Sequence, residues 1–453
     1  MTPPSTPDGR FLIAFDANTF AWNPTWTRLD NRLTLRVAGY TIDRGRQFEL
    51  DRTDGGRAVV ELHDRVGVLD PTNPTGEFYG KLEPLKQARI GRLNPITGVW
   101  QSRFRGFIED FDYSFDPSQK VNRVTISLVD LYEPLQAIEM QPGAFGHPPP
   151  EESSDQVFFD NQTVQARIQK ILTDAGIPAD WWIIFTGNVN VKEAPYSPGE
   201  SPLSALQEAA DAEWPGVANV YVDRWGRLKF HGRNAKFDPA GAASSAGDDN
   251  WDYVEWEAGD GAAVAALPGN TAHVREFAFN HGLSKVINHA LATPRRLTPL
   301  TSAEIGGQLV TDSVSIGLRG TRSWSAQDLL TDGGLGTPAT TDLEETRRFA
   351  EYYVANYKDP RNRITSIGFR SMQPGQPGAG ANWAMINRVD IADTVEVTVD
   401  SPGGGGFNLE PFFVEGLHEQ VRPLNDDYDD VTLTLDLSPR AYFTSNPWAG
   451  PGE

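Results

Sequence analysis

The sequence predicts a mainly β protein with α+β insertions: two barrel-like tube domains, a small α/β domain and a helix-containing insertion. Three observations lead to this prediction. Segments at both ends of the chain alternate apolar and polar residues, which is the period of half-buried strands. Segments in the middle place apolar residues at helical spacing, beside a hairpin pattern. The order strand-rich, helical, strand-rich is a coarse two-fold repetition, although no short repeat is present.

The first barrel-like domain is expected at residues 1–140. In "GRQFELDRTDGGRAVVELHD" the apolar residues alternate on both sides of Asp54-Gly55, which predicts a hairpin. Its first strand would contain Phe48 and Leu50, alternating with Glu49. A further alternation in "VTISLV", residues 124–129, predicts another strand of the same sheet.

The segment "FRGFIEDFDYSFD" predicts a bulged strand. Phe104 and Ile108 share one parity, whereas the aromatic residues after them share the other. Because a one-residue slip moves every side chain to the opposite face, we place a bulge near Glu109–Asp110. Long, bulged antiparallel strands favour a closed or nearly closed barrel.

A small α/β domain is expected at 150–233, after the Pro-rich linker "QPGAFGHPPPEESSD". The segment "NQTVQARIQKILTDAGIP" has helical spacing and ends at Gly176. A second helix begins in "SPLSALQEAADAEW", where Ser201 can cap it and Pro202 fits its first turn. The segment "NVYVDRWGRLKFHG" reads as a hairpin.

Residues 234–270 are rich in Ala, Gly, Ser and Asp, which predicts an exposed arm or loop. Trp251, Tyr253 and Trp256 within it could anchor in the groove of a neighbouring subunit or partner.

The second barrel-like domain is expected at 271–310 with 380–440. Strands are predicted in "SKVINHALATP" and "DSVSIGLRG", and again around 395–399 and 431–437, where apolar and polar residues alternate. The helix-containing insertion at 311–379 includes "TDLEETRRFAEYYVANY". Thr341 and Glu344 have capping-box spacing there, and Phe349, Tyr353 and Tyr357 share one helix face.

Composition restricts the function classes. The chain has 453 residues, a net charge of −21 and no cysteine. The acidic balance argues against a surface that grips nucleic acid, but DNA could pass such a surface without adhering. No cysteine means no disulfide and no thiolate metal site. No stretch approaches the roughly 20 apolar residues that span a bilayer, and the N-terminus lacks a secretion-signal pattern, so no membrane insertion is expected.

Motifs for chemistry are incomplete, and we expect no catalytic, cofactor or metal site. "HEQVR" has His418, but Arg422 stands where a zinc-protease motif needs a second His. No Gly-x-Ser-x-Gly elbow is present, and "PGGGGF" lacks the Lys of a phosphate loop. The acidic cluster of Asp248, Asn250 and Asp252 lacks the Gly and Glu of a calcium loop, which favours a solvated loop.

Two alternative function classes stay open. Glu109, Asp110 and Asp112 could in principle supply paired carboxylates for glycan cleavage, although a wet sheet face has the same pattern. The tryptophans, above all in "NWDYVEW", could stack on sugars, although loop packing or an interface is favoured.

The chain resembles minor tail proteins of long-tailed phages of actinobacteria. The resemblance lies in "ELDRTDGGRAVVELHDRVGVLDPTNP", "FRGFIEDFDYSFDP", "NRVTISLVDLYEPL", "SPLSALQEAADAEWPGVANVYVDRWGRLKFHGR" and "FFVEGLHEQVRPLNDDYDDVTLTLDLSP", and it covers most of the chain outside 234–270. These motifs are structural and carry no chemistry.

The resemblance implies a structural virion protein similar to the baseplate hub at the tail tip. Such a hub is a homotrimeric ring in which two barrel-like domains per subunit give a pseudo-sixfold tube for DNA ejection. It would join the tail tube and distal tail protein to the central tip or fibre, without specific DNA binding, and be made in the host cytoplasm. Some hubs carry lytic extensions; none is expected here. A host-receptor (glycan) binding tail protein and a cell-wall glycan-cleaving tail enzyme are the alternatives. Glu49, Asp51 and Glu61 would face either the lumen of such a tube or its outside, and the sequence leaves both open.

Overall fold

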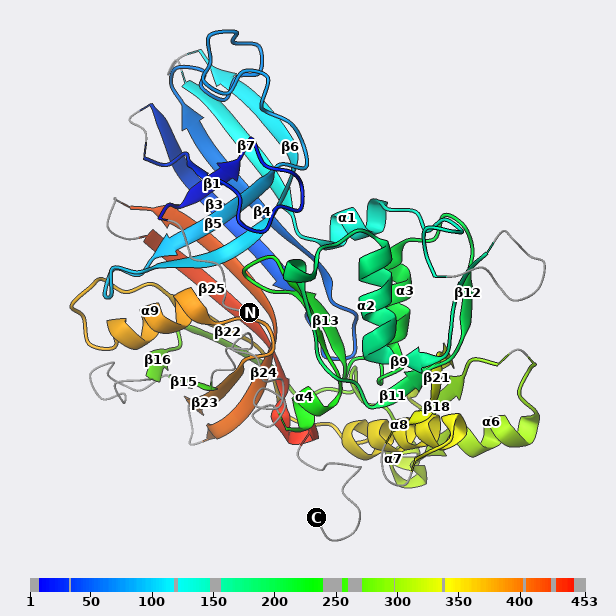
Figure 1. Ribbon diagram of the computed structural model, residues 1–453. Coiled ribbons are helices and arrows are strands. Elements are labelled where there is room, and N and C mark those ends of the chain that lie inside the picture. Colours follow the sequence, from blue (N-terminus) through cyan, green and yellow to red (C-terminus); the bar gives the residue numbers. More distant parts are fainter. Residues whose placement is uncertain are drawn as a thin grey trace.

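The structure is a computed structural model of the chain. It describes residues 8–31, 34–117, 121–146, 156–238, 255–259, 271–296, 298–335, 339–401, 405–424 and 429–443. The protein is mainly β, with large antiparallel sheets and several helices. A sheet lobe and an α/β lobe lie side by side in Figure 1, with a layer of helices below the latter.

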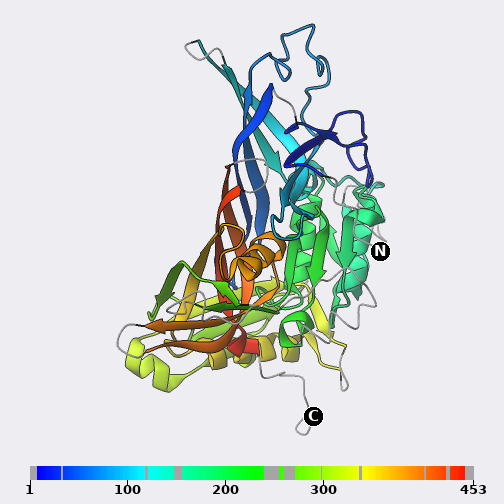
Figure 2. The same ribbon diagram turned by 90° about the vertical axis from the view of Figure 1, so that its left-hand side faces the viewer.

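One 14-stranded sheet forms the sheet lobe. Its N-terminal half contains β1 (Phe11–Ala14), β2 (Thr27–Arg28), β3 (Leu35–Gly45), β4 (Asp54–Asp64), β5 (Gln87–Leu93), β6 (Trp100–Asp116) and β7 (Val121–Val129). Its C-terminal half contains β15 (Glu255–Gly259), β16 (Thr271–His273), β17 (Glu276–Asn280), β22 (Arg363–Arg370), β23 (Thr394–Ser401), β24 (Gly405–Pro423) and β25 (Asp429–Pro439). The β6–β7 hairpin and the loop between β4 and β5 together form one end of the molecule (Figures 1 and 2).

The two halves repeat one strand order. In the first, β3, β4, β7, β6 and β5 are neighbours; in the second, β17, β22, β25, β24 and β23 are neighbours. Every pairing within both series is antiparallel. The two series also follow the same chain order, so the coarse repetition seen in the sequence corresponds to a repeated topology. Within the described residues, no ladder closes either half into a barrel.

The long strands alternate as the sequence predicted. Val124, Ile126 and Leu128 on β7 are buried in the same core as Val60 on β4 and Leu433 on β25. The register between β6 and β7 shifts between Ile108 and Asp110, which confirms the predicted bulge.

The prediction that Phe48 and Leu50 lie in the first strand of a hairpin is wrong. The partner of β4 is β3, which ends at Gly45, and residues 46–53 form a loop. Glu49 is 2% exposed in this loop, and its carboxylate accepts a hydrogen bond of 3.0 Å from the Tyr357 hydroxyl. Glu49 therefore serves internal packing and faces no lumen, whereas Asp51 and Glu61 are exposed.

The α/β lobe contains the predicted helices and hairpin. Its helices are α1 (Tyr132–Ala137), α2 (Val164–Asp174), α3 (Pro202–Asp211), α4 (Asn234–Phe237) and the 3-10 turn η1 (Ala179–Trp181). Its strands are β8 (Val157–Phe159), β9 (Gln162–Thr163), β10 (Trp182–Ile184), β11 (Val189–Val191), β12 (Ala194–Tyr196), β13 (Asn219–Val222) and β14 (Leu228–His231). Ser201 caps α3 through Ser204 N, and Pro202 stands in its first turn, as predicted.

A layer of helices and short strands lies between β17 and β22 in the chain. It contains β18 (His289–Pro294), α6 (Ser302–Gln308), β19 (Leu309–Thr311), α7 (Ser313–Arg319), β20 (Ser323–Leu329), β21 (Thr331–Gly334) and α8 (Asp342–Tyr357). The capping box of Thr341 and Glu344 begins α8, and its aromatic face is buried. Helix α9 (Ala379–Arg388) follows β22, and the 3-10 turn η3 (Arg440–Phe443) follows β25.

Two boundaries of the expected insertion at 311–379 are therefore corrected. β18 pairs with β19 and β20 in a separate sheet, while β22 belongs to the large sheet. The reason is that small residues of β18, Ala290 and Ala292, pack in the aromatic core of α8. The expected strand "DSVSIGLRG" is helix α7, which begins because the Asp312 side chain accepts a hydrogen bond from Ser315 N.

The expected exposed arm at 234–270 is corrected in its described part. Residues 234–237 form α4, and β15 lies in the large sheet, parallel to β23 and β16. Trp256 is 8% exposed and its indole N–H donates to Asp393. Trp251, Tyr253 and the candidate calcium residues Asp248, Asn250 and Asp252 lie outside the described residues.

Among the described helices, none combines the length and the apolar composition that crossing a membrane would require.

Candidate assembly surface and buried polar junction

The outer face of the large sheet is polar across both halves. On the first half it carries Asp43, Arg57, Glu61, Arg123, Thr125, Asp110 and Asp112; on the second half it carries His418, Gln420, Thr434 and Arg370. Alternation places these side chains opposite the core residues of the same strands. The candidate carboxylates Glu109, Asp110 and Asp112 are exposed on this open face. They line no described cleft, as paired catalytic carboxylates would.

Among the described strands, one antiparallel pairing joins the two halves, that of β24 with β3. β24 pairs with β23 along its first part and with β3 from Gly416 to Val421, while β25 occupies its other edge. His418 of β24 lies within the β24–β3 pairing. Its ring nitrogens are 2.8 Å from an oxygen of Asp43 on β3 and 2.8 Å from an oxygen of Asp436 on β25. Hydrogen bonds that the imidazolium donates to Asp43 and Asp436 raise the pKa of His418 to about 10. This imidazolium therefore links three strands as a cation at neutral pH.

We expect the His418 link to be lost in alkali. Because its pKa is raised on folding, its stabilisation is complete below the ordinary pKa of His and disappears as the pH rises through about 10. The side chain is 40% exposed. After solvent screening the effect should be about 0.5–1 kcal/mol. The free energy of unfolding of the wild type and of His418→Gln should differ most near pH 6 and converge above pH 10. A constant difference over this range would contradict the ionic role.

Beneath the polar face, two arginines of the first half bind one carboxylate of the second. Arg92 on β5 and Arg103 on β6 both pair with Glu419 on β24, and all three side chains are 0% exposed. Burial alone would raise the pKa of Glu419, but the charges of Arg103 and Arg92 outweigh it, so the pKa is lowered. A buried ion pair of this kind requires that its remaining donors find partners.

Further donors of Arg92 and Arg103 bind the C-terminal end of α9, while Arg92 Nε donates to the Tyr40 hydroxyl. Arg92 donates to the carbonyl of Ile386 at 2.9 Å, and Arg103 donates to that of Asn387 at 2.8 Å. Arg224, from the hairpin turn of the α/β lobe, donates to the carbonyl of Arg388. The last carbonyls of a helix lack intrahelical partners and carry partial negative charge. Three arginines from two parts of the chain therefore satisfy one helix end.

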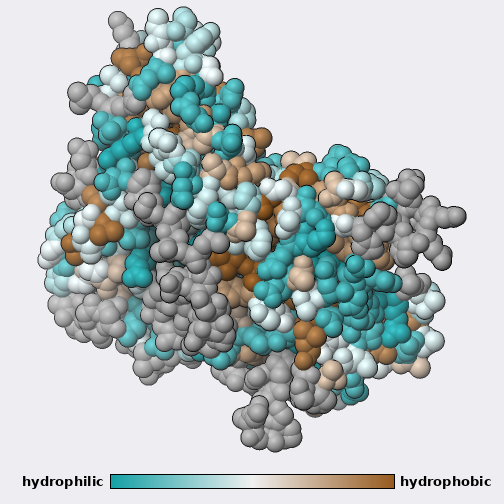
Figure 3. All heavy atoms as spheres, in the orientation of Figure 1, coloured by the Kyte–Doolittle hydropathy of each residue, from teal (hydrophilic) through white to brown (hydrophobic). Residues whose placement is uncertain are grey.

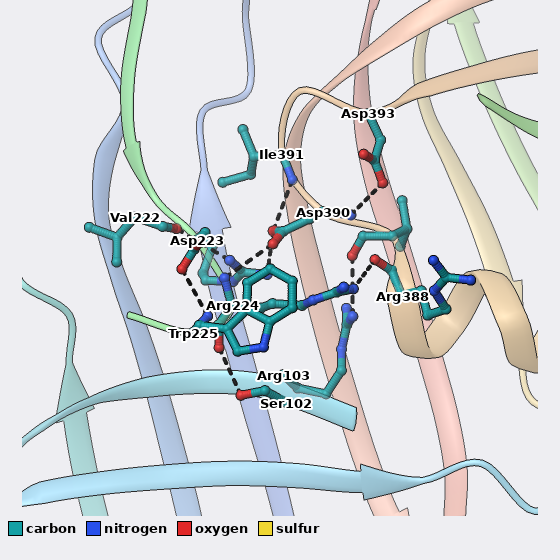
Figure 4. A network of polar contacts seen from close by, with 12 residues as sticks. Ser102, Arg103, Val222, Asp223, Arg224, Trp225, Arg388, Asp390, Ile391 and Asp393 are labelled. Carbon is teal, nitrogen blue, oxygen red and sulfur yellow. Dashed lines mark hydrogen bonds and ion pairs between the residues drawn. The ribbon is translucent and has the colours of Figure 1, made fainter. Parts of the chain in front are cut away.

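The β13–β14 turn, which contains Arg224, makes further polar contacts with the large sheet (Figure 4). Asp390 pairs with Arg44 of β3 at 2.8 Å and accepts a hydrogen bond of 3.1 Å from Arg224 N. Ser102 of β6 donates to the carbonyl of Arg224 at 2.9 Å. The β13–β14 turn is therefore fixed to β3, β6 and the segment after α9 at once. This turn contains the Asp223-x-x-Gly226 pattern of the tail-protein resemblance, and its role is structural.

A second buried carboxylate completes the junction. Glu415 pairs with Arg46 after β3 at 2.7 Å and with Lys236 of α4, and it accepts a hydrogen bond of 2.5 Å from Ser438. Burial opposes ionisation, but Arg46 and Lys236 lower the pKa of Glu415 to about 2. Glu415 and Glu419 lie on the same strand, and neither stood out in the sequence because their partners are far away along the chain.

Most of the described tryptophans pack against other parts of the molecule. The Arg105 guanidinium contacts the rings of Trp22 and Trp181, 4.5 Å from each centroid, and that of Trp26 at 5.5 Å. Trp214, Trp383 and Trp181 are fully buried, and Trp324 stacks on Tyr353. In Figure 3 hydrophobic side chains form separate spots, the largest between the two lobes. The described tryptophans therefore form no exposed sugar platform.

Within the described residues, no group of three or more His, Asp and Glu side chains could hold a metal ion. His418 is occupied by two aspartates, and Arg422 is exposed on the same strand.

Comparison with solved structures gives the fold its context. No protein-family model matches the chain, and no curated protein is similar to it in sequence. The 43 kDa tail protein of prophage MuSo2 from Shewanella oneidensis aligns with a TM-score of 0.52 and 13% identity, over 90% of this chain and 98% of that one. The chain has the fold of a phage tail protein. A tail protein from Neisseria meningitidis MC58 aligns with a TM-score of 0.49 and 13% identity, over 91% of this chain and 97% of that one.

Proposed function

We propose that this chain is a structural virion protein that forms the baseplate hub at the tail tip of a long-tailed phage of actinobacteria. The observation that carries the proposal is the repeated topology: one subunit presents two sheet halves of the same strand order, joined edge to edge. Three such subunits supply six similar units, so a threefold ring can match a hexameric tail tube. Closed cyclic symmetry is the usual form of soluble assemblies.

The polar outer face of the sheet is the surface we assign to the channel. Its exposed acids, such as Asp43, Glu61 and Asp112, alternate with Arg57 and Arg123 rather than forming one basic stripe. Proteins that hold DNA do so by neutralising phosphates with clustered Lys and Arg. A mixed face does not, so DNA can pass during ejection without adhering. The ring would contact the tail tube and distal tail protein at one end and the central tip or fibre at the other.

The proposed role is structural rather than enzymatic. The charged clusters that are buried are held by neighbouring side chains and by helix carbonyls, as at Glu419 and Glu415. These contacts support a role in stabilising the joint between the halves.

Copy number in the intact tail tests the proposal. We expect imaging of purified particles to show three copies of this chain around the tail axis, at the tip. Six copies, one copy or a position along the tail shaft would contradict it.

A further inference from the structure

The two halves correspond residue by residue as well as strand by strand. Both long strands, β6 and β24, have a bulge. In each, the bulge comes directly after the residue that follows the last pairing with the neighbouring strand, β5 or β23. On β6, Phe107 pairs with Gln87 and the register then shifts between Ile108 and Asp110. On β24, Phe413 pairs with Thr394 and the register then shifts between Val414 and Gly416. The segments "FIE" and "FVE" therefore occupy equivalent positions, and residue 110 of β6 corresponds to residue 416 of β24.

Beyond the bulge, β24 no longer pairs with β23. On the same edge it pairs with β3 instead. There, in antiparallel register, His418 lies opposite Asp43, Gln420 opposite Thr41 and Val421 opposite Tyr40. This is the pairing with β3 that joins the halves. The core-facing residues of this pairing, such as Ile42 and Val421, are buried.

Beyond its bulge, β6 has no such partner within the described residues. β5 accompanies it only as far as Phe107, and β7 occupies the other edge. Phe111, Tyr113 and Phe115 point to the core side of the sheet. Tyr113 is 40% exposed and Phe115 is 63% exposed, although the equivalent residues Glu419 and Val421 are buried. The end of β6 therefore presents a strand edge beside uncovered aromatic side chains.

The strand equivalent to β3 in the second half is β17. Among the described strands it pairs with β22 alone. Tyr40 of β3 lies opposite Val60 of β4, as Phe277 of β17 lies opposite Ile367 of β22, so Phe277 corresponds to Tyr40. Phe279 follows on the same face and is 51% exposed. β17 thus has the position and the side chains to pair in the way that β3 does.

We propose that residues 110–115 of β6 pair in antiparallel fashion with β17 of a second copy of this chain. Transferring the β24–β3 register places Phe115 opposite Phe277, Tyr113 opposite Phe279, Ser114 opposite Ala278 and Asp112 opposite Asn280 of the partner subunit. The aromatic residues of both strands would cover each other on the core side, which cross-strand aromatic pairs favour. The polar residues would extend the outer face from one subunit to the next.

This pairing is heterologous, because β6 and β17 are different surfaces, so it builds a closed ring or an open fibre. The ring closes if the joint between subunits has the same geometry as the internal joint and the six rotations add up to one full turn. The pairing also covers two strand edges that have no partner strand among the described residues, and uncovered edges promote aggregation. It deepens the proposed hub function and rests on it.

Engineered disulfides in tail particles test the pairing, and the natural chain has no cysteine to interfere. Ser114→Cys with Ala278→Cys changes two small, exposed side chains, so folding should be preserved. After mild oxidation we expect most of the chain to migrate as covalent dimers and trimers on a non-reducing gel. Asp112→Cys with Asn280→Cys should behave in the same way.

Two control variants make the result decisive. Thr41→Cys with Gln420→Cys occupies the equivalent position within one chain, so it shows whether this pair geometry oxidises. Asp112→Cys with Ala278→Cys is two residues out of register and should not cross-link, because disulfides need Cβ atoms about 3.5–4.5 Å apart. Three-copy rings without the Ser114–Ala278 link, while the internal control forms, would overturn this pairing and leave the hub proposal intact. A copy number other than three would overturn the hub proposal itself.

Discussion

Replacing Glu419 by Ala should cost about 3–5 kcal/mol of folding free energy, because it leaves two buried guanidinium groups without their carboxylate. Arg92 and Arg103 are both 0% exposed and cannot turn towards water. Urea unfolding of the variant and the wild type, followed by tryptophan fluorescence, measures the loss.

The neighbouring residue provides the matched control for this substitution. Gln420 lies on the same strand but is exposed on the outer face. Gln420→Ala should change the free energy of unfolding by less than about 0.5 kcal/mol. A loss below about 1 kcal/mol for Glu419→Ala would show that the arginines find other partners, and the junction would then not depend on this carboxylate.

Gly45→Ala should destabilise the protein by about 2–4 kcal/mol, through backbone strain and overpacking together. Gly45 has a φ of +96°, and a Cβ there would lie 2.3 Å from the carbonyl oxygen of Glu415. β3 and β24 would have to move apart where they pair. Thermal and urea unfolding both report this loss.

Gly80→Ala separates the two causes. Gly80 also has a positive φ, +74°, but a Cβ there would meet nothing within 4 Å. It should therefore show only the strain, about 1 kcal/mol. If the two variants were equally stable, the close approach of β3 and β24 would not be a constraint on the fold.

The sequence was informative wherever the structure is decided by neighbours in the chain. The bulge in β6 follows from a change of parity around Ile108, and the capping box at Thr341 begins α8. The pattern at 46–53 predicts a strand, because Phe48 and Leu50 alternate with polar residues, but the structure has a loop there. Glu49 turns inwards to Tyr357, which is 308 positions away, and no local pattern contains that contact.

The segment that forms helix α7 also has the alternation that predicts a strand. Val314, Ile316 and Leu318 alternate like a strand, and Val314 and Leu318 are 70% and 71% exposed. Their burial cannot have decided the local structure. The Asp312-x-x-Ser315 cap was the available signal for a helix.

The buried junction could not be predicted from one sequence. Glu419 is 327 positions from Arg92 and 316 from Arg103, and a Glu on an alternating strand ordinarily indicates a solvated face. The nearest signal is the recurrence of "FIE" and "FVE" before both bulges, which marks the two strands as equivalent. It does not reveal that, among the described strands, β24 gains β3 as a partner beyond its bulge and β6 gains none.

The pairing of β3 with β24 also affects how the chain folds during its synthesis. Asp43 and His418 meet although 375 positions separate them, so a ribosome that adds about 5–20 residues per second needs roughly 20–75 s between them. During that time the first half is outside the ribosome with the edge of β3 uncovered. Nascent chains on neighbouring ribosomes present the same edge, so the period before β24 emerges is when misassembly is most probable and when a chaperone has most to protect.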